Sequence, residues 1–225
     1  MRNATTRVIL VAAVALALAG CADGSEPDGQ APTQDNTGQD GVDQSQQRVE
    51  AALLTVEDLP EGWVLDLSGA TSSSGMTTEP AECGVLLSPA HIQEPLAQAE
   101  AAFAAGPTGP FINQSVSAFD GDAAELLGQA VDAFDRCAEF SSTDPGGVTT
   151  AFRATPLSFP SLGDRTVAVR LEGSVGPIQL VVDRIMIAAG SNGVTLGAGG
   201  FAPLEADELE SIVTTAFEKL NDVAG

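Results

Sequence analysis

Alternating apolar and polar positions mark the C-terminal half of the chain as a series of β-strands. Residues 166–172 place Val167, Val169 and Leu171 on one face and small or charged residues on the other. Residues 178–189 and 194–199 are further apolar stretches, separated by the hairpin signal Gly-Ser-Asn-Gly at 190–193. Residues 111–119 and 148–155 also have strand character. Because strands joined by short turns pair in opposite directions, we expect an antiparallel sheet.

Other segments repeat apolar residues every three or four positions, as a helix with one buried face does. One begins at Asp122, its expected N-cap, and its apolar face comprises Leu127, Ala130, Val131, Phe134, Cys137 and Ala138. Another spans 205–220, with a stripe of Leu209, Ile212, Val213, Ala216 and Leu220. Residues 91–105 are predicted to be helical as well. This order predicts an α+β fold: a single domain with an antiparallel β-sheet packed by helices on one face.

The N-terminus has the pattern of a bacterial lipoprotein signal. Arginines precede an apolar run at 8–19, which is shorter than the roughly 20 residues of a membrane-spanning helix. The run ends in Leu-Ala-Gly-Cys, which resembles a lipobox whose Cys21 becomes acylated and forms the new N-terminus. Two acyl chains would anchor the protein stably in a lipid bilayer. We therefore expect a signal peptide at 1–20 and lipidation at Cys21, with an ordinary signal peptide or a retained anchor as alternatives.

The composition changes sharply after Cys21. Residues 22–47 are rich in Gln, Asp and Gly and hold too little apolar surface to form a core. We expect residues 21–47 to be a lipid-anchored, disordered linker and residues 48–225 to form the α+β domain. The localisation that follows is the extracytoplasmic face of the cell membrane.

The charge of the chain excludes one class of partner. The sequence has 31 acidic residues against nine Lys and Arg, for a net charge of -22. Nucleic acids carry dense negative charge and need a basic surface, so we expect no nucleic-acid binding.

Two cysteines, Cys83 and Cys137, follow Cys21. In an exported protein the simplest interpretation is a disulfide, which would stabilise the fold by roughly 4 kcal/mol through loop closure. Two buried free thiols are the alternative.

Motifs for catalysis are lacking in the sequence. There is no Gly-x-Ser-x-Gly elbow and no His-Glu-x-x-His, and Lys219 is the single lysine, which excludes a phosphate loop. The single histidine, His91, has no triad motif near it, and no spacing singles out a pair of carboxylates. We expect no enzyme activity, cofactor or metal site.

Four charged residues, Arg165, Arg170, Asp183 and Arg184, fall within predicted strands or at their edges. Arginine on a sheet can hold a ligand carboxylate through two parallel hydrogen bonds, so we name all four as candidate ligand-binding residues. Ion pairing between these arginines and Asp183 or Asp164 is the structural alternative.

A family resemblance combines these features. The opening Leu53-Leu54-Thr55 to Leu59-Pro60-Glu61-Gly62-Trp63 is followed by Cys83, a helical Cys137, the segment 163–170, the hairpin 183–196 and an acidic final helix. This order resembles the actinobacterial sensor-domain lipoproteins and the extracellular sensor domain of PknH-type Ser/Thr kinases. Kinase-linked members carry two disulfides, whereas this chain can form one.

The resemblance implies a cleft and an unidentified extracytoplasmic ligand, such as a small molecule or an envelope component. We therefore expect a non-catalytic, lipid-anchored binding or sensor module. The alternatives are a carrier of envelope lipid or glycolipid, which needs an apolar cavity, and a hydrolase that uses paired carboxylates.

Overall fold

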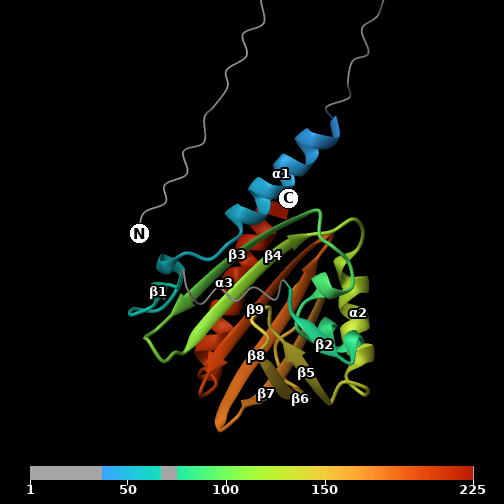
Figure 1. Ribbon diagram of the computed structural model, residues 1–225. Coiled ribbons are helices and arrows are strands. Elements are labelled where there is room, and N and C mark those ends of the chain that lie inside the picture. The colour runs from blue at the N-terminus through green and yellow to red at the C-terminus, as the bar shows by residue number, and fades with distance from the viewer. Residues whose placement is uncertain (1–36, 67–74, 225) are drawn as a thin grey trace, which may run out of the picture. The chain divides into compact units, whose positions relative to one another are not determined.

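A nine-stranded antiparallel sheet is the centre of the computed structural model, which describes residues 37–66 and 75–224 (Figure 1). The strands lie in the order β1-β3-β4-β9-β8-β7-β6-β5-β2. Their bounds are β1 Val64–Leu65, β2 Thr77–Glu79, β3 Ala97–Ala104, β4 Phe111–Ala118, β5 Glu139–Thr143, β6 Thr149–Pro156, β7 Arg165–Val175, β8 Ile178–Ala189 and β9 Asn192–Gly200. The predicted fold class, a single-domain α+β fold with an antiparallel sheet, is confirmed.

The late strands pair as their alternation and turns predict. β7 pairs with β8 along its whole length, and β8 pairs with β9 from Ala189 opposite Asn192. A two-residue turn joins β8 to β9. Gly190 in this turn adopts a φ of 58°, which the tight turn requires and glycine tolerates. The predicted hairpin at 190–193 is therefore confirmed.

The helix predicted over 91–105 is wrong. Pro89–His91 forms a single 3-10 turn, η3, and the chain then enters β3 between β1 and β4. The alanines at 97 and 99 favour a helix intrinsically, but they also alternate with Gln98 and Glu100 in a strand pattern. Pairing with β4 satisfies the backbone and buries Ala97 and Ala99, so tertiary structure overrides propensity here.

The described helices are α1 (Thr37–Ala51), α2 (Ala123–Ala133) and α3 (Ala206–Ala224), with short 3-10 segments η1 (Val56–Asp58), η2 (Ala81–Leu86) and η3. Asp122 caps α2 as predicted, by accepting a hydrogen bond from the Ala124 N–H. α2 ends earlier than expected, and Val131 lies on its exposed side at 45% exposure. The whole predicted stripe of α3 is buried.

The helices pack on both faces of the sheet. Ile185 and Ile187 of β8 pack in one cluster with α1 and α3, whereas Met186 and Ala188 of the same strand pack in another with α2. Because neighbouring residues of a strand point to opposite faces, α2 and α3 lie on opposite sides of the sheet. In Figure 1, α3 lies behind the strands and α2 at the right of the view. The sequence predicted one shared face, and the structure differs in this respect.

α1 begins inside the segment expected to be a disordered linker. It is helical from Thr37, so residues 37–47 differ from that expectation, while residues 21–36 lie outside the described part. Val49 in the last turn of α1 and Ala52 directly after the helix are buried. Buried Gln114 of β4 fastens this end, since its Oε1 accepts from the Leu54 N–H at 2.7 Å and its Nε2 donates to the Ala52 carbonyl at 3.3 Å.

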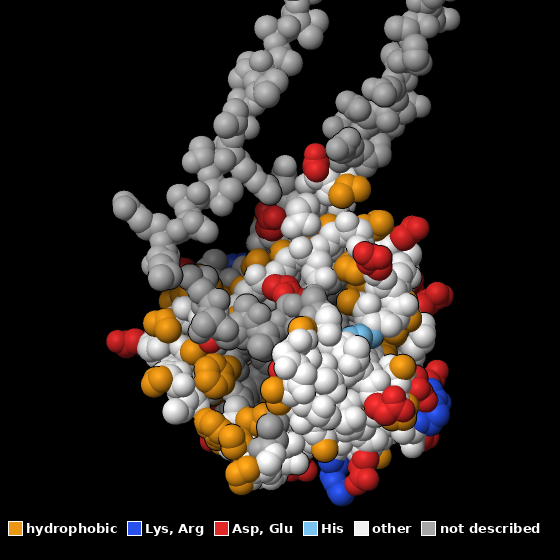
Figure 2. All heavy atoms as spheres, viewed as in Figure 1, with side chains coloured by type: hydrophobic (Ala, Val, Ile, Leu, Met, Phe, Trp, Pro, Cys, Tyr) orange, Lys and Arg blue, Asp and Glu red, His pale blue; other side chains and the backbone are white. Residues whose placement is uncertain are grey.

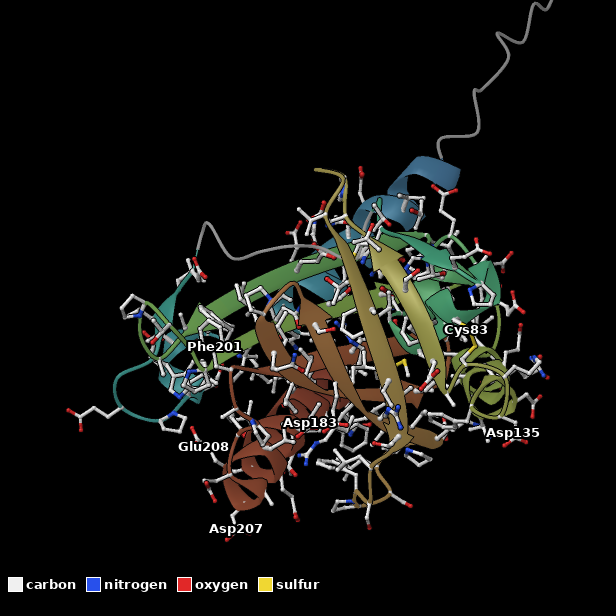
Figure 3. The ribbon with its side chains drawn as sticks, turned by 60° about the horizontal axis from the view of Figure 1, so that its bottom comes forward. Cys83, Asp135, Asp183, Phe201, Asp207 and Glu208 are labelled. Atoms are coloured by element: carbon white, nitrogen blue, oxygen red, sulfur yellow. A yellow bond between two sulfur atoms is a disulfide. The ribbon has the colours of Figure 1, made fainter. Side chains whose placement is uncertain are left out.

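The disulfide between Cys83 and Cys137 is confirmed, with a sequence separation of 54 residues. Both residues are fully buried, and Figure 3 shows Cys83 beside α2. The bond fastens η2 to the chain that leaves α2, on the face of the sheet opposite α3. Among the described helices, none is both long and apolar enough to cross a membrane.

Candidate functional site

Two of the four candidate ligand residues, Arg170 and Asp183, bind each other. They face one another on β7 and β8, and Arg170 Nε donates to Asp183 Oδ1 at 2.6 Å while Nη2 donates to Oδ2 at 2.7 Å. Asp183, labelled in Figure 3, is 1% exposed. These hydrogen bonds raise the pKa of Arg170. The carboxylate is thus occupied from within the protein, and the pair lies on the α3 face as a structural ion pair.

The other two candidates, Arg165 and Arg184, do not lie with that pair. Arg165 is exposed at the start of β7, beside Gly128 of α2. Arg184 follows Asp183 on β8 and therefore points to the opposite face of the sheet. The four residues consequently form no common site.

Arg184 lies on the floor of a groove on the sheet face opposite α3. The groove has a volume of about 720 Å³, which lies in the usual range for small-molecule sites. Figure 2 looks onto this face, and hydrophobic side chains gather at its lower left. The apolar part of the lining includes Met76, Leu87, Phe111, Phe152, Leu171, Leu180 and Val182.

The groove runs across several neighbouring strands of the sheet. Its lining comes from β3, β4 and β9 on one side and from β5–β8 on the other, with Leu87 from the segment after η2. α2 packs farther along the same face, in one cluster with Met186 and Ala188, and contributes no residue to the described lining of the groove. The disulfide holds η2 in place, and so positions the Leu87 wall.

Polar atoms of the groove lack partners within the described residues. The buried side-chain nitrogen and oxygen atoms without a hydrogen bond there are Arg184 Nε and Ser142 Oγ, and both residues line the groove. Most buried polar atoms in proteins are hydrogen-bonded, so two unpartnered atoms in one lining make this groove the candidate site.

Burial lowers the pKa of Arg184 to about 10, so the guanidinium stays charged at neutral pH. The pKa of His91 in η3 is also lowered, first by burial of its own side chain and then by the positive charge of Arg184. Asp66 and Asp144 also line the groove, and the Asp144 carboxylate accepts a hydrogen bond from the Val148 N–H within its turn. Arg184 is the sole Lys or Arg of the described lining.

Glutamates from β2, β5 and β7 (Glu79, Glu139 and Glu172) line a second, more open depression, where Glu139 is paired with Arg153 at 2.8 Å. The described residues contain no group of three or more His, Cys, Asp or Glu arranged to hold a metal.

The apolar lining of the groove was not predicted from the sequence. Val181 separates Leu180 from Val182, so this part of β8 is a continuous apolar run without alternation, and such a run does not show which of its residues line a groove. Asn113 and Ser142 carried no signal in the sequence.

The fold is similar to that of a solved extracellular domain. The extracellular domain of PknH from Mycobacterium tuberculosis matches with a TM-score of 0.58 and 18% identity, over 79% of this chain and 96% of that one. An uncharacterized protein (Rv0999 ortholog) from Mycobacterium smegmatis matches with a TM-score of 0.38 and 13% identity, over 76% and 97% of the two chains. No protein-family model and no curated protein matches the sequence. The resemblance to the PknH extracellular domain is thus confirmed at the level of the fold.

Proposed function

We propose that the protein is a lipid-anchored, non-catalytic binding or sensor module on the extracytoplasmic face of the cell membrane, and that the groove between β4, β9 and β5–β8 holds its ligand. The groove is the observation that carries the proposal, because it combines a ligand-sized volume with an apolar lining. The lipobox-like tetrapeptide ending at Cys21, the disulfide and the fold shared with an extracellular domain support an extracytoplasmic place.

A neutral fluorescent probe, N-phenyl-1-naphthylamine, tests the groove without testing charge. We expect saturable fluorescence enhancement with the wild-type protein. Val182→Trp fills the groove and should weaken binding about tenfold, or roughly 1.4 kcal/mol. Val131→Trp, at an exposed position of α2, is the matched control and should bind as the wild type does. Absent binding by the wild type, or equal binding by both variants, would reject the groove as the site.

Lipidation needs a separate experiment. We expect intact-mass analysis of membrane-extracted native protein to show a chain that begins at Cys21 and carries acyl groups. Cys21→Ser should leave the precursor uncleaved and unacylated. A native chain that retains residues 1–20 without acyl groups would contradict the anchoring proposal.

The apolar lining also supports a second candidate function, that of a carrier for an envelope lipid or glycolipid. A carrier must move its ligand between membranes, whereas a sensor only binds it. Transfer of a fluorescent phospholipid between donor and acceptor vesicles, accelerated by the protein and suppressed in Val182→Trp, would favour the carrier.

A further inference from the structure

Three cations of this acidic chain form ion pairs among the described residues. Arg153, Arg170 and Lys219 each pair with a carboxylate, at 2.8, 2.6 and 2.6 Å respectively. The described arginines without an ion pair are Arg48, Arg136, Arg165 and Arg184. The first three are exposed to solvent, whereas Arg184 is half-buried and its Nε is buried without a hydrogen-bond partner, although Asp183 precedes it directly in the sequence. The two-residue period of the strand is the reason, since it directs the Asp183 carboxylate to the other face. A charged guanidinium is therefore left on the groove floor without its usual counter-ion.

The backbone around Arg184 leaves room for that guanidinium. Gly197 of β9 lies opposite both Arg184 of β8 and Asn113 of β4 in the strand register. A Cβ atom at position 197 would clash with Asn113 Oδ1 and would lie 3.2 Å from Arg184 Nη2. The absence of a side chain at Gly197 thus lets an amide and a guanidinium converge over one glycine in the lining of the groove.

The charge and the apolar lining around Arg184 determine which ligand chemistry fits the space over Gly197, which we call the cradle. Isolated charge in a half-buried position favours an anion that restores the missing pair, and guanidinium hydrogen-bonds carboxylate and phosphate oxygens well. The neighbouring wall is apolar, with Phe111, Leu180 and Val182 among its members. A purely polar anion would leave this wall in contact with water, and a metal cation would be repelled by Arg184. An anionic headgroup on an apolar body satisfies both parts.

We propose that the groove binds a small amphiphile whose single carboxylate or phosphate group pairs with Arg184 over Gly197, while its apolar chain packs along Phe111, Leu180 and Val182. This proposal rests on the groove being the ligand site, and it names the class of that ligand. It also gives the unpaired guanidinium a function, since the headgroup offsets the cost of holding the charge out of water.

Calorimetric titration with three twelve-carbon probes tests the proposal. Dodecanoate and dodecyl phosphate carry the anionic headgroup in its two forms, and dodecanol is the neutral control. We expect wild-type protein to bind the better anion at least about tenfold more tightly than dodecanol, because hydrogen bonds to charged groups are stronger than those between neutral groups. The stronger of the two anions then identifies the headgroup.

Variants separate the headgroup pairing from the groove itself. Arg184→Met should abolish the preference for anions and retain dodecanol binding, whereas Arg184→Lys should retain part of the preference. Gly197→Ala should also lose the preference, because its methyl group occupies the cradle. Arg136→Met removes an equal charge from an exposed position and should behave as the wild type.

The single histidine of the chain gives a readout that needs no variant. The charge of Arg184 contributes to the lowered pKa of His91, so pairing Arg184 with an anion should raise that pKa in an NMR titration of the wild type. Equal affinity for all three probes, with no change at His91, would overturn the amphiphile proposal and leave the groove proposal standing. Absence of binding by all three probes would overturn both.

Discussion

Loss of Arg170 should destabilise the protein more than loss of Arg153, the other arginine that forms an ion pair among the described residues. Arg170→Met preserves most of the side-chain stem and removes both donors to the Asp183 carboxylate. That carboxylate is 1% exposed, so it would become a buried charge without a partner. An unpaired buried charge is costly because its hydration has been lost and nothing replaces it.

The structure sets the size of the effect. Removal of one partner from a buried ion pair costs about 3–5 kcal/mol. The Arg170 side chain is 34% exposed, so water can enter the space that the guanidinium leaves. We therefore expect a loss near the lower limit, about 3 kcal/mol, which lowers Tm by roughly 6–12 °C for a domain of this size.

Substitution of Asp183 should lower the free energy of unfolding less than substitution of its partner Arg170. Asp183→Asn removes the buried charge and leaves a guanidinium that already reaches solvent, so it should cost only about 1 kcal/mol. Arg153→Met is the matched control, because its pair with Glu139 is 63% and 72% exposed and should contribute at most about 1 kcal/mol.

Urea unfolding followed by the fluorescence of Trp63, the single tryptophan, measures all three variants. Trp63 is 4% exposed in the core, so unfolding changes its environment. The reasoning is refuted if Arg170→Met costs no more than Arg153→Met, or if Asp183→Asn is the most destabilised of the three.

Three further predictions concern the disulfide, one glycine and the histidine. Replacement of Cys83 and Cys137 by serine should lower the free energy of unfolding by about 4 kcal/mol, and equal urea midpoints before and after reduction would contradict this. Gly163→Ala should lower the free energy of unfolding by more than about 2 kcal/mol, because φ is +60° and the new Cβ would clash with the Ala188 carbonyl oxygen. Gly190→Ala has nearly the same φ, +58°, but open space around the new Cβ, so it should cost roughly 1 kcal/mol. Similar losses of stability for the two variants in thermal unfolding would reject the steric argument. The pKa of His91 in the folded protein lies below its usual 6.5, so as pH drops the unfolded chain binds the proton first and the free energy of unfolding should fall below about pH 6.5. His91→Gln should flatten this part of the profile of stability against pH. An unchanged slope in the variant would show that other groups cause the pH dependence.

The late strands and the final helix were predictable because their signals are local. A period of two over β7, a two-residue turn at Gly190 and a stripe at three- and four-residue steps in α3 each depend on neighbours in sequence. β3 was not predictable in this way. Its alanine-rich sequence suits a helix, and its strand conformation depends on β4, which satisfies its backbone and buries one of its sides.

The candidate site also combines features that follow from local sequence with features that depend on tertiary packing. Once this segment is predicted to be a strand, it follows that Asp183 and Arg184 occupy opposite faces of the sheet, because successive side chains of an extended chain alternate. Tertiary packing determines that α3 covers the Asp183 side, where Arg170 pairs with the carboxylate. The same packing places α2 outside the lining of the groove on the other side, where Arg184 has no ion-pair partner among the described residues. Which face of a strand becomes covered depends on how far distant helices extend over it, and that distance is set by packing between elements that are remote in the sequence.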